Sequence, residues 1–582
     1  MQPATSTAVY DGGAWKISLP PQHAVLFKRL FDGVEKDGQV LRLSDTPKHA
    51  RDLLWFADRH PMEFHPLLRV LAQADVHIQR EAAVERILGE EYIPHDPELA
   101  LPLRDYQARA GDLAFANGGL LLADEMGLGK TASAIGLLAR KAALPAVVVT
   151  LTSLPFQWQR ELKRFAPDLR THVVKSTQPY RLDMARDKRV PLPDVSIMSY
   201  SKLTSRTSMR SWVDKLTDEG MCRTVVFDEG QELRNNDSEK YRAARRLRGD
   251  AAYCMTLTGT PIYNHGGEIH NVVEIVQPGA LGTRVEFLRE WCGRSDSEEH
   301  MQNKGTGEMR KIRVRDPIAL GSHLRELGVF LRRTRADVGR ELPPLQRVRH
   351  VVDIDESELT EMDATLERLC RSLLYSHSHT ERFTAAGELD WQMRRATGLA
   401  KAMHVAHFVR MLVESGEKVV LYAWHHEVYD RFRRIFTDPQ LGDLKPAFFT
   451  GRESVAAKER ELRRFVSGET KLFIMSLRAG AGLDGLQHVC KTVVFGELDW
   501  SPGVHGQCEA RVFRDGQGHP VLVYYLITEE GSDPVVLDAL NLKTEQHEGI
   551  VNLTSDVAVL KGSEEHMRKV ALAYMRRKGK LH

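Results

Sequence analysis

Along much of the chain, short runs of consecutive apolar residues alternate with stretches in which apolar residues recur at helical spacing. The alternation begins at Leu101, runs to about Arg340, and returns from about residue 396 to residue 550. Continuous apolar runs are typical of parallel strands buried on both faces by helices. The first predicted strands are residues 120–123, 146–151, 195–200, 224–229 and 255–260. The second set is residues 418–423, 445–450, 471–476, 492–497 and 521–526.

The first hundred residues have a different pattern. Two alternating runs meet at Asp11-Gly12-Gly13, which predicts a β-hairpin. Thr46 followed by Pro47 predicts a helix start, and a long helical pattern extends from about His65 to Leu88. This region carries no nucleotide motif, so we expect it to fold apart and to influence substrate choice.

These patterns predict an α/β protein with two tandem parallel-sheet lobes, helical insertions and a small N-terminal α+β domain. Between the lobes the chain is helical and charged, apart from the strand-like VRHVVDI. The predicted parts are an accessory domain (1–100), a first lobe with a helical protrusion (101–345), a helical linker (346–395), a second lobe (396–550) and a basic C-terminal helix (551–582).

Composition excludes several classes of protein. Of 582 residues, 42% are hydrophobic and 27% charged, as in a soluble globular protein rather than a disordered chain or a fibre. No stretch approaches the ~18 apolar residues of a membrane span, and the N-terminus lacks signal-peptide features. We therefore expect no membrane contact and a cytoplasmic location, in a bacterium or a virus-infected host cell.

Charge and cysteines narrow the picture further. The 81 Lys and Arg residues nearly balance the 79 Asp and Glu residues, so any binding of nucleic acid must depend on local positively charged patches. The 6 cysteines include no CxxC pair, which argues against a disulfide framework or a zinc ribbon.

The most informative segment is GLLLADEMGLGKTASAIGLL (119–138). A predicted strand leads into a loop containing Gly127 and Gly129, and a helix starts near Lys130. Backbone N–H groups of such a loop cradle phosphates, Lys130 adds a positive charge, and Thr131 can ligate Mg²⁺. Asp124 stands where the general phosphate-loop pattern has its first glycine.

A second motif, VVFDEGQ, places Asp228 and Glu229 at the end of a predicted strand. Ligands of α/β proteins bind at that edge of the sheet. Asp228 would hold Mg²⁺ through water, and Glu229 would orient or deprotonate the attacking water.

A third motif, GVHGQCEARVFRDGQ (503–517), carries three polar residues at helical spacing. Gln507, Arg511 and Arg514 are predicted to share one helix face. That face is either a solvated surface or, opposite a bound nucleotide, a source of arginine fingers for the γ-phosphate.

The order and spacing of these motifs resemble the Swi/Snf-type branch of superfamily 2 helicases over roughly residues 101–550. The matching segments are LRDYQ, DEMGLGKT, TSLPFQWQRELKRFAP, VFDEGQELRN, LTGTPIYN, SLRAGAGLDGLQ and QCEARVFRDGQ. The details are similar to phage and bacterial members. The resemblance implies two RecA-like lobes, a DNA-dependent ATPase activity, ATP and Mg²⁺ as cofactors, and sequence-nonspecific binding to double-stranded DNA. It indicates no particular protein partner.

The resemblance also assigns roles to individual residues. Expected catalytic residues are Lys130, Asp228, Glu229, Arg511 and Arg514. Expected nucleotide-binding residues are Gln107, which would read adenine, with Asp124, Gly127, Gly129, Lys130, Thr131 and Gln507. Thr131 and Asp228 are the expected metal ligands. Expected DNA contacts are Gln157, Trp158, Ser199 and Arg478, although Trp158 is also a candidate for core packing.

Two positions depart from the family pattern. Gln231 replaces a usual histidine that helps to couple hydrolysis to DNA, and we expect altered coupling rather than inactivity. Asp484-Gly485 stands where Asn-Leu is commoner in remodellers.

Three arginine clusters are candidate phosphate contacts or simply solvated helix faces. They are Arg242, Arg245, Arg246 and Arg248; Arg332, Arg333 and Arg335; and Arg460, Arg463 and Arg464.

The leading hypothesis is an ATP-driven translocase on duplex DNA that remodels DNA or protein–DNA complexes in replication, repair or recombination. The alternatives are an RNA or single-strand helicase and an ATP-gated DNA-binding module with little hydrolysis.

Overall fold

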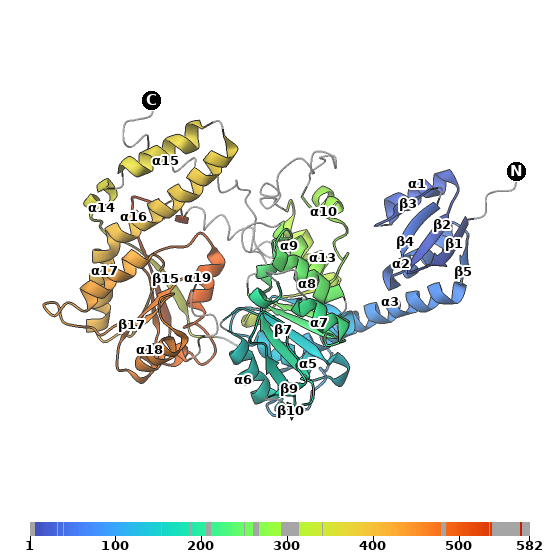
Figure 1. Ribbon diagram of the computed structural model, residues 1–582, viewed down its shortest axis with the longest axis horizontal. Coiled ribbons are helices and arrows are strands. Elements are labelled where there is room, and N and C mark those ends of the chain that lie inside the picture. Colours follow the sequence, from blue (N-terminus) through green and yellow to red (C-terminus); the bar gives the residue numbers. More distant parts are fainter. Residues whose placement is uncertain are drawn as a thin grey trace. The chain divides into compact units, whose positions relative to one another are not determined.

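Figure 1 shows a computed structural model of the chain, which forms two compact units. The first unit contains residues 1–122, 130–258 and 267–331, and the second contains residues 123–129, 259–266 and 332–582. The structure describes residues 6–31, 33–38, 40–152, 154–185, 188–204, 211–249, 251–259, 267–292, 314–339, 342–361, 363–376, 378–478, 483, 485–534, 536–537, 571–572 and 575.

The N-terminal part of the first unit is an α+β fold with its own core (Figure 1). Its five strands pair in the order β3-β4-β2-β1-β5. The predicted hairpin is confirmed, because β1 and β2 are antiparallel and Gly12 and Gly13 turn with φ of 56° and 89°. The predicted cap is also confirmed, since Thr46 Oγ1 accepts the His49 N–H at 3.1 Å. The elements are β1 (Ser6–Asp11), β2 (Ala14–Ser18), α1 (Pro21–Leu30), β3 (Glu35–Asp37), β4 (Val40–Ser44), α2 (Pro47–Arg59), β5 (Met62–His65) and α3 (Leu67–Leu88).

Helix α3 connects this fold to the remainder of the first unit. Val70 and Ala74 belong to the N-terminal core, whereas Val84 and Ile87 are buried near the opposite end of the helix. The helix also packs on α4 (Asp105–Asn117).

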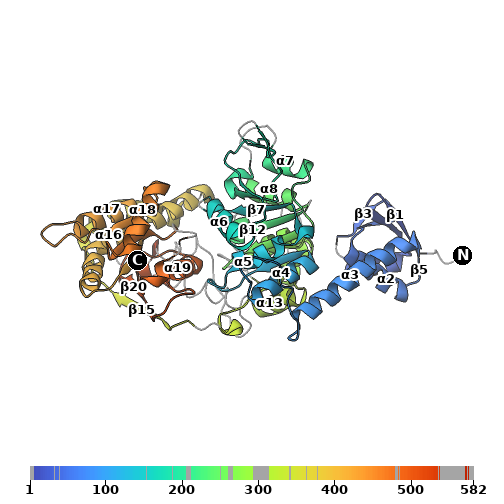
Figure 2. The same ribbon diagram turned by 90° about the horizontal axis from the view of Figure 1, so that it is seen from below.

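The first α/β lobe has a seven-stranded sheet in the order β14-β6-β13-β12-β7-β11-β8, with helices on both sides (Figure 2). All of its strand pairs are parallel. The strands are β6 (Gly119–Leu122), β7 (Ala146–Thr150), β8 (Thr171–Val173), β11 (Val195–Ser199), β12 (Thr224–Asp228), β13 (Tyr253–Leu257) and β14 (Phe330–Leu331). A separate pair is β9 (Met184–Ala185) and β10 (Lys188–Arg189). The further helices are α5 (Lys130–Leu138), α6 (Pro155–Phe165), α7 (Trp212–Asp218), α8 (Glu239–Gly249), α9 (Glu268–Val276), α10 (Arg284–Glu290) and α13 (Pro317–Glu326).

The second lobe has a six-stranded parallel sheet in the order β15-β20-β19-β16-β18-β17. Its strands are β15 (Leu345–Val351), β16 (Val419–Ala423), β17 (Ala447–Phe449), β18 (Leu472–Ser476), β19 (Thr492–Phe495) and β20 (Val521–Ile527). Its helices are α14 (Glu356–Glu361), α15 (Asp363–Tyr375), α16 (His379–Glu414), α17 (His426–Phe436), α18 (Val455–Ser467) and α19 (Pro502–Glu509).

The continuous apolar runs follow from burial on both faces of these sheets. In β16, Val419 and Leu421 belong to one hydrophobic core, while Val420 and Tyr422 belong to the core on the opposite face. Because side chains alternate along a strand, every position in such a strand meets a packed layer.

The predicted boundary at residue 396 is wrong in two respects. β15 pairs with β20 in the second sheet, so that sheet begins at Leu345. Helix α16 is continuous from His379 to Glu414 and crosses the boundary. Most β15 side chains are exposed or half-buried, which explains its weak hydrophobic signal. The predicted basic helix at 551–582 lies almost entirely outside the described residues.

Candidate nucleotide-binding site

The predicted phosphate loop lies between the carboxyl end of β6 and the start of α5. Gly127 and Gly129 have φ of 92° and 75°, a left-handed conformation in which a β-carbon is unfavourable. Lys130 is the first residue of α5, and Thr131 is the second. Successive N–H groups of such a loop, followed by a helix N-terminus, suit a phosphate.

Asp124, one of the predicted nucleotide-binding residues, has a structural role in the loop. Its side chain is 1% exposed, and the Arg333 guanidinium binds both of its carboxylate oxygens, with Nη2–Oδ2 at 2.5 Å and Nε–Oδ1 at 3.0 Å. The backbone N–H of Arg333 also donates to Oδ1 at 3.0 Å. Asp124 therefore fixes the start of the loop through its buried ion pair with Arg333.

Two neighbouring arginines extend this anchor. Arg335 Nη1 lies 2.7 Å from Glu125 Oε1, and its Nη2 donates to the Met126 carbonyl. Arg332 Nη1 donates to the Ala123 carbonyl at 2.6 Å, and burial lowers the pKa of its guanidinium. Neither alternative for this cluster, a DNA phosphate contact or a solvated helix face, is supported, because the three guanidinium groups bind the 123–126 segment.

Asp228 lies at the carboxyl end of β12, where three groups donate hydrogen bonds to its carboxylate. Oδ2 accepts hydrogen bonds from Thr150 Oγ1 at 2.9 Å and from Trp158 Nε1 at 2.8 Å. Oδ1 accepts the Glu229 N–H at 3.1 Å. Burial raises the pKa of Asp228, whereas these hydrogen bonds and the charge of Lys130 oppose the increase.

Glu229 adopts an uncommon left-handed backbone conformation, with φ and ψ both 55°. Its Oε2 accepts a 2.6 Å hydrogen bond from Gln231 Nε2. Gln231 Oε1 in turn accepts from Thr258 Oγ1 at 2.7 Å. Gln231 therefore uses both ends of its amide to connect the carboxylate after β12 with the segment after β13.

The donors near the phosphate loop suit Mg²⁺. This ion prefers oxygen ligands, retains several waters and often takes only one or two protein carboxylates. Thr131 supplies a hydroxyl and Asp228 a carboxylate. No group of three or more His, Cys, Asp and Glu side chains in the described part of the chain could hold a metal ion.

Gln107 is 4% exposed at the start of α4, and its Oε1 accepts the Arg104 backbone N–H at 3.1 Å. Gln107, which is predicted to bind adenine, therefore also caps the start of α4.

In the second unit, the predicted shared helix face is wrong. α19 carries Gln507 but ends at Glu509, so Arg511 and Arg514 lie in the following turns. The Glu509 carboxylate is held by Arg347 at 2.7 and 2.8 Å, and Val512 is fully buried. These tertiary contacts accompany the change from helix to turns. Arg514 Nη1 donates to the Leu483 carbonyl at 3.2 Å.

The four predicted DNA contacts divide into two pairs. Trp158 and Ser199 are 2% and 1% exposed, so a direct DNA contact by either side chain is not supported. Gln157 is half-buried. The Arg478 side chain is 52% exposed, and its Nη2 lies 2.9 Å from Asp499 Oδ2. Gln157 and Arg478 therefore retain access to a ligand.

The sequence contains no signal that marks Thr150, Arg333 or Thr258 as partners of the site residues. The repeated arginines of FLRRTR were visible, but their acidic partners lie about 210 residues away in the sequence. No local pattern could connect them.

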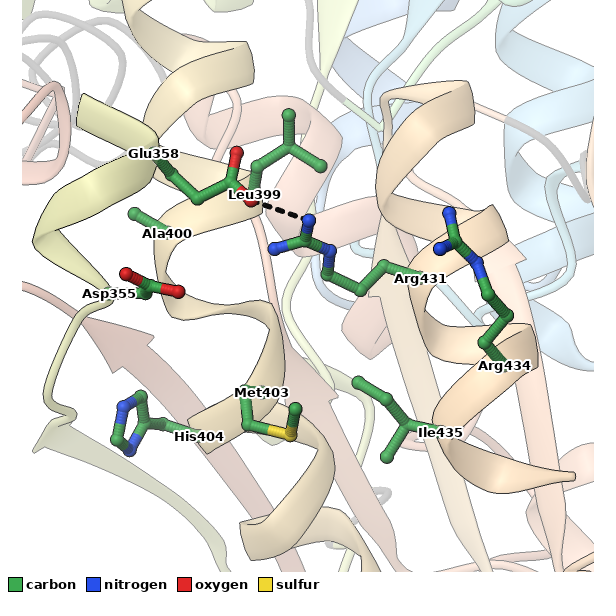
Figure 3. A pocket seen from close by; sticks show the side chains of 9 residues that line it. All are labelled: Asp355, Glu358, Leu399, Ala400, Met403, His404, Arg431, Arg434 and Ile435. Carbon is green, nitrogen blue, oxygen red and sulfur yellow. Dashed lines mark ion pairs between the residues drawn. The ribbon is translucent and has the colours of Figure 1, made fainter. Parts of the chain in front are cut away.

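A separate pocket of about 630 Å³ lies in the second unit between α14, α16 and α17 (Figure 3). Arg431 and Glu358 form an ion pair of 2.5 Å there, and Arg434 also lines the pocket. None of the predicted site residues lines this pocket.

The SNF2-related domain family matches residues 49–385, and the chain belongs to this family. The chain is similar to the Bos taurus "DNA annealing helicase and endonuclease ZRANB3", with 27% identity over 440 residues that cover 74% of this chain and 38% of the relative. It is similar to the Drosophila melanogaster "SWI/SNF-related matrix-associated actin-dependent regulator of chromatin subfamily A-like protein 1", with 25% identity over 464 residues covering 77% of this chain and 56% of the relative. The chain thus spans less than two thirds of the length of these relatives.

Among solved structures, the "Sulfolobus solfataricus SWI2/SNF2 ATPase core in complex with dsDNA" has a TM-score of 0.34 and 19% identity, covering 80% of this chain and 100% of that chain. No helix within the described ranges is long and apolar enough to cross a membrane.

The buried Asp124–Arg333 pair leads to a stability prediction. Arg333→Met should reduce the free energy of unfolding by about 3–5 kcal/mol, because it leaves the Asp124 charge buried without its partner. Combining it with Asp124→Leu should recover much of that loss, since no charge then remains. Thermal or urea unfolding would measure both changes.

The exposed Arg181–Asp183 pair, with Nη2–Oδ2 at 2.8 Å, provides the control. Arg181→Met should change stability little, because exposed ion pairs contribute little. Equal losses in the Arg333 and Arg181 variants would contradict the proposed anchor.

Proposed function

We propose that this protein is an ATP-dependent translocase on double-stranded DNA. The observation that carries the proposal is the arrangement of two motifs on one parallel sheet. β6, which leads to the phosphate loop, and β12, which ends at Asp228, both pair with β13. Neighbouring strands are about 4.8 Å apart and β13 lies between β6 and β12, so the strand ends that carry the two motifs are roughly 10 Å apart. That spacing suits the phosphates of a bound nucleotide.

Each residue of this site then has a defined task. Lys130 and the loop N–H groups would bind the β- and γ-phosphates, and Thr131 and Asp228 would hold Mg²⁺. The ion would neutralise charge on the phosphates. Glu229 would orient the attacking water and accept its proton, and Gln231 would keep the Glu229 carboxylate in place.

The second unit would supply Arg511 and Arg514. We infer that these arginines act on the γ-phosphate of ATP bound at the phosphate loop, which belongs to the same unit. An arginine in that position stabilises the charge that spreads over the transferring phosphoryl group.

DNA is favoured over RNA as the partner because the ZRANB3 relative is named a DNA annealing helicase. The formal net charge is +2, so binding would depend on local contacts such as Arg478. Contacts to backbone phosphates carry no sequence information, which fits a motor that moves along any duplex.

The first prediction from this proposed function concerns the substrate. Duplex DNA should increase ATP turnover strongly, and the stimulation should fall steeply with salt because phosphate contacts release counterions. Steady-state phosphate release would be measured with duplex, forked and single-stranded DNA and with RNA. Equal stimulation by RNA would favour the RNA-helicase alternative. Nucleotide-dependent DNA binding without turnover would favour the ATP-gated binding module.

The second prediction concerns Arg514. Arg514→Ala should keep ATP affinity within several-fold but lose about 10³–10⁵ in DNA-stimulated turnover, the usual contribution of an arginine finger. Lys130→Ala should weaken nucleotide binding as well. A fluorescent-nucleotide titration and steady-state turnover on the same preparations would separate the two effects.

Arg434→Ala provides a control in the second unit, because Arg434 lines the pocket of Figure 3. It should leave turnover unchanged. Near-normal turnover in Arg514→Ala would remove the finger assignment.

The third prediction concerns Gln231. Gln231→Ala should lower turnover by about 10- to 100-fold, because Glu229 loses a hydrogen bond to its charged carboxylate. Nucleotide affinity should stay within a few-fold. Gln159→Ala is the matched control, since it removes another side-chain amide of the same unit, which donates to Thr171 Oγ1 at 3.2 Å. Similar losses in both variants would argue against a specific role for Gln231.

A further inference from the structure

The buried side chain of Trp158 makes a hydrogen bond that its sequence motif does not predict. It lies in the first turns of α6, where its ring and Leu162 form the buried face and Phe156 is 57% exposed. An indole N–H can only donate. Here its acceptor is the Asp228 carboxylate, at 2.8 Å.

Thr150 and Trp158 stand at the two ends of one segment. Thr150 is the last residue of β7, and Trp158 follows shortly after α6 begins at Pro155. Both donate to the same Asp228 oxygen, Oδ2. The residues between them include Gln157, one of the predicted DNA contacts that remains accessible. Any displacement of this segment would therefore change both hydrogen bonds.

Within the part of the chain that the structure describes, one hydrogen-bonding position of the Asp228 carboxylate remains open. A carboxylate offers about four lone-pair sites. Thr150 and Trp158 occupy those of Oδ2, and the Glu229 N–H occupies one of Oδ1 at 3.1 Å. The Tyr200 hydroxyl fixes the Asp228 backbone by donating to its carbonyl at 2.9 Å. Oδ1 thus retains one site that can face Mg²⁺ or its water.

We propose that Trp158 is a positioning residue. It links the binding of DNA at the end of β7 and the start of α6 to the orientation of the Asp228 carboxylate. This inference rests on the proposed DNA-dependent ATPase function. DNA that holds the end of β7 and the start of α6 in place also holds the two donors to Oδ2. The open site of Oδ1 is then fixed toward the metal, and hydrolysis accelerates. Trp158 acts through Asp228 and does not touch the nucleotide.

The test uses Trp158→Phe in the full chain, which keeps an aromatic ring but removes the N–H donor. DNA-stimulated turnover should fall by about 10- to 100-fold, the loss expected for one hydrogen bond to a charged group. The dissociation constant for duplex DNA should stay within about twofold. The increase in fluorescent-nucleotide affinity caused by Mg²⁺ should become smaller, while affinity in EDTA is unchanged.

Trp212→Phe is the matched control. Trp212 is fully buried in the same unit, and its Nε1 donates to the Ser176 carbonyl at 3.0 Å, away from Asp228. It should leave both the DNA stimulation and the Mg²⁺ effect unchanged. Equal losses in the two tryptophan variants would show a packing role and overturn the proposal.

Thr150→Val provides an independent route if Trp158→Phe does not fold. It removes the second donor to Oδ2 with almost no change in shape, and it should reduce the same two quantities. Unchanged Mg²⁺ dependence in Thr150→Val and in any folded Trp158→Phe would overturn the positioning role.

The two proposals fail in different ways. If duplex DNA does not stimulate the wild-type protein, the proposed function is wrong, and the Mg²⁺ titration still tests whether Trp158 orients Asp228. If the wild type is stimulated and Trp158→Phe is stimulated equally, only the link through Trp158 is wrong.

Discussion

A carboxylate that must bind a metal in a water-poor place has to be kept charged and correctly oriented. We propose this role for Asp228, whose pKa is raised by burial, while the hydrogen bonds from Trp158 and Thr150 and the charge of Lys130 oppose the rise. Much of the first lobe serves this requirement. β12 brings Asp228 to the sheet edge, while β7 and α6 bring its two side-chain donors from neighbouring positions.

The same constraint shapes the phosphate loop. Asp124 is buried at the base of the loop and is acceptable there only because Arg333 binds both of its oxygens. Gly127 and Gly129 then allow the backbone to turn with positive φ. The Asp124–Arg333 ion pair therefore holds the loop in place. The backbone N–H groups of the loop remain available to bind phosphate.

Glu229 and Gln231 add a connection between two strands. The amide of Gln231 bridges the Glu229 carboxylate and the Thr258 hydroxyl. A neutral amide has a donor and an acceptor at any pH near neutrality, so this bridge does not depend on a protonation state. Gln231, which stands where the family usually has histidine, thus joins the segments after β12 and β13.

The sequence by itself determined the strands, the glycine-rich loop and the acidic pair. These features depend on local rules: burial on both faces gives apolar runs such as that of β16, and positive φ requires glycine at residues 127 and 129. It also determined the hairpin at Gly12-Gly13 and the cap at Thr46. In each case the physical cause lies within a few residues of the signal.

Only the tertiary structure decided which polar side chains meet. Arg333 was a candidate DNA contact until the fold brought it to Asp124, 209 residues earlier. Trp158 was a candidate for DNA binding or for core packing, and the fold gave its N–H to Asp228. The helix that should have carried Arg511 and Arg514 ends at Glu509, which Arg347 of β15 holds. Ion pairs and hydrogen bonds of this kind depend on distance in space, and a linear pattern of residue types contains no record of that distance.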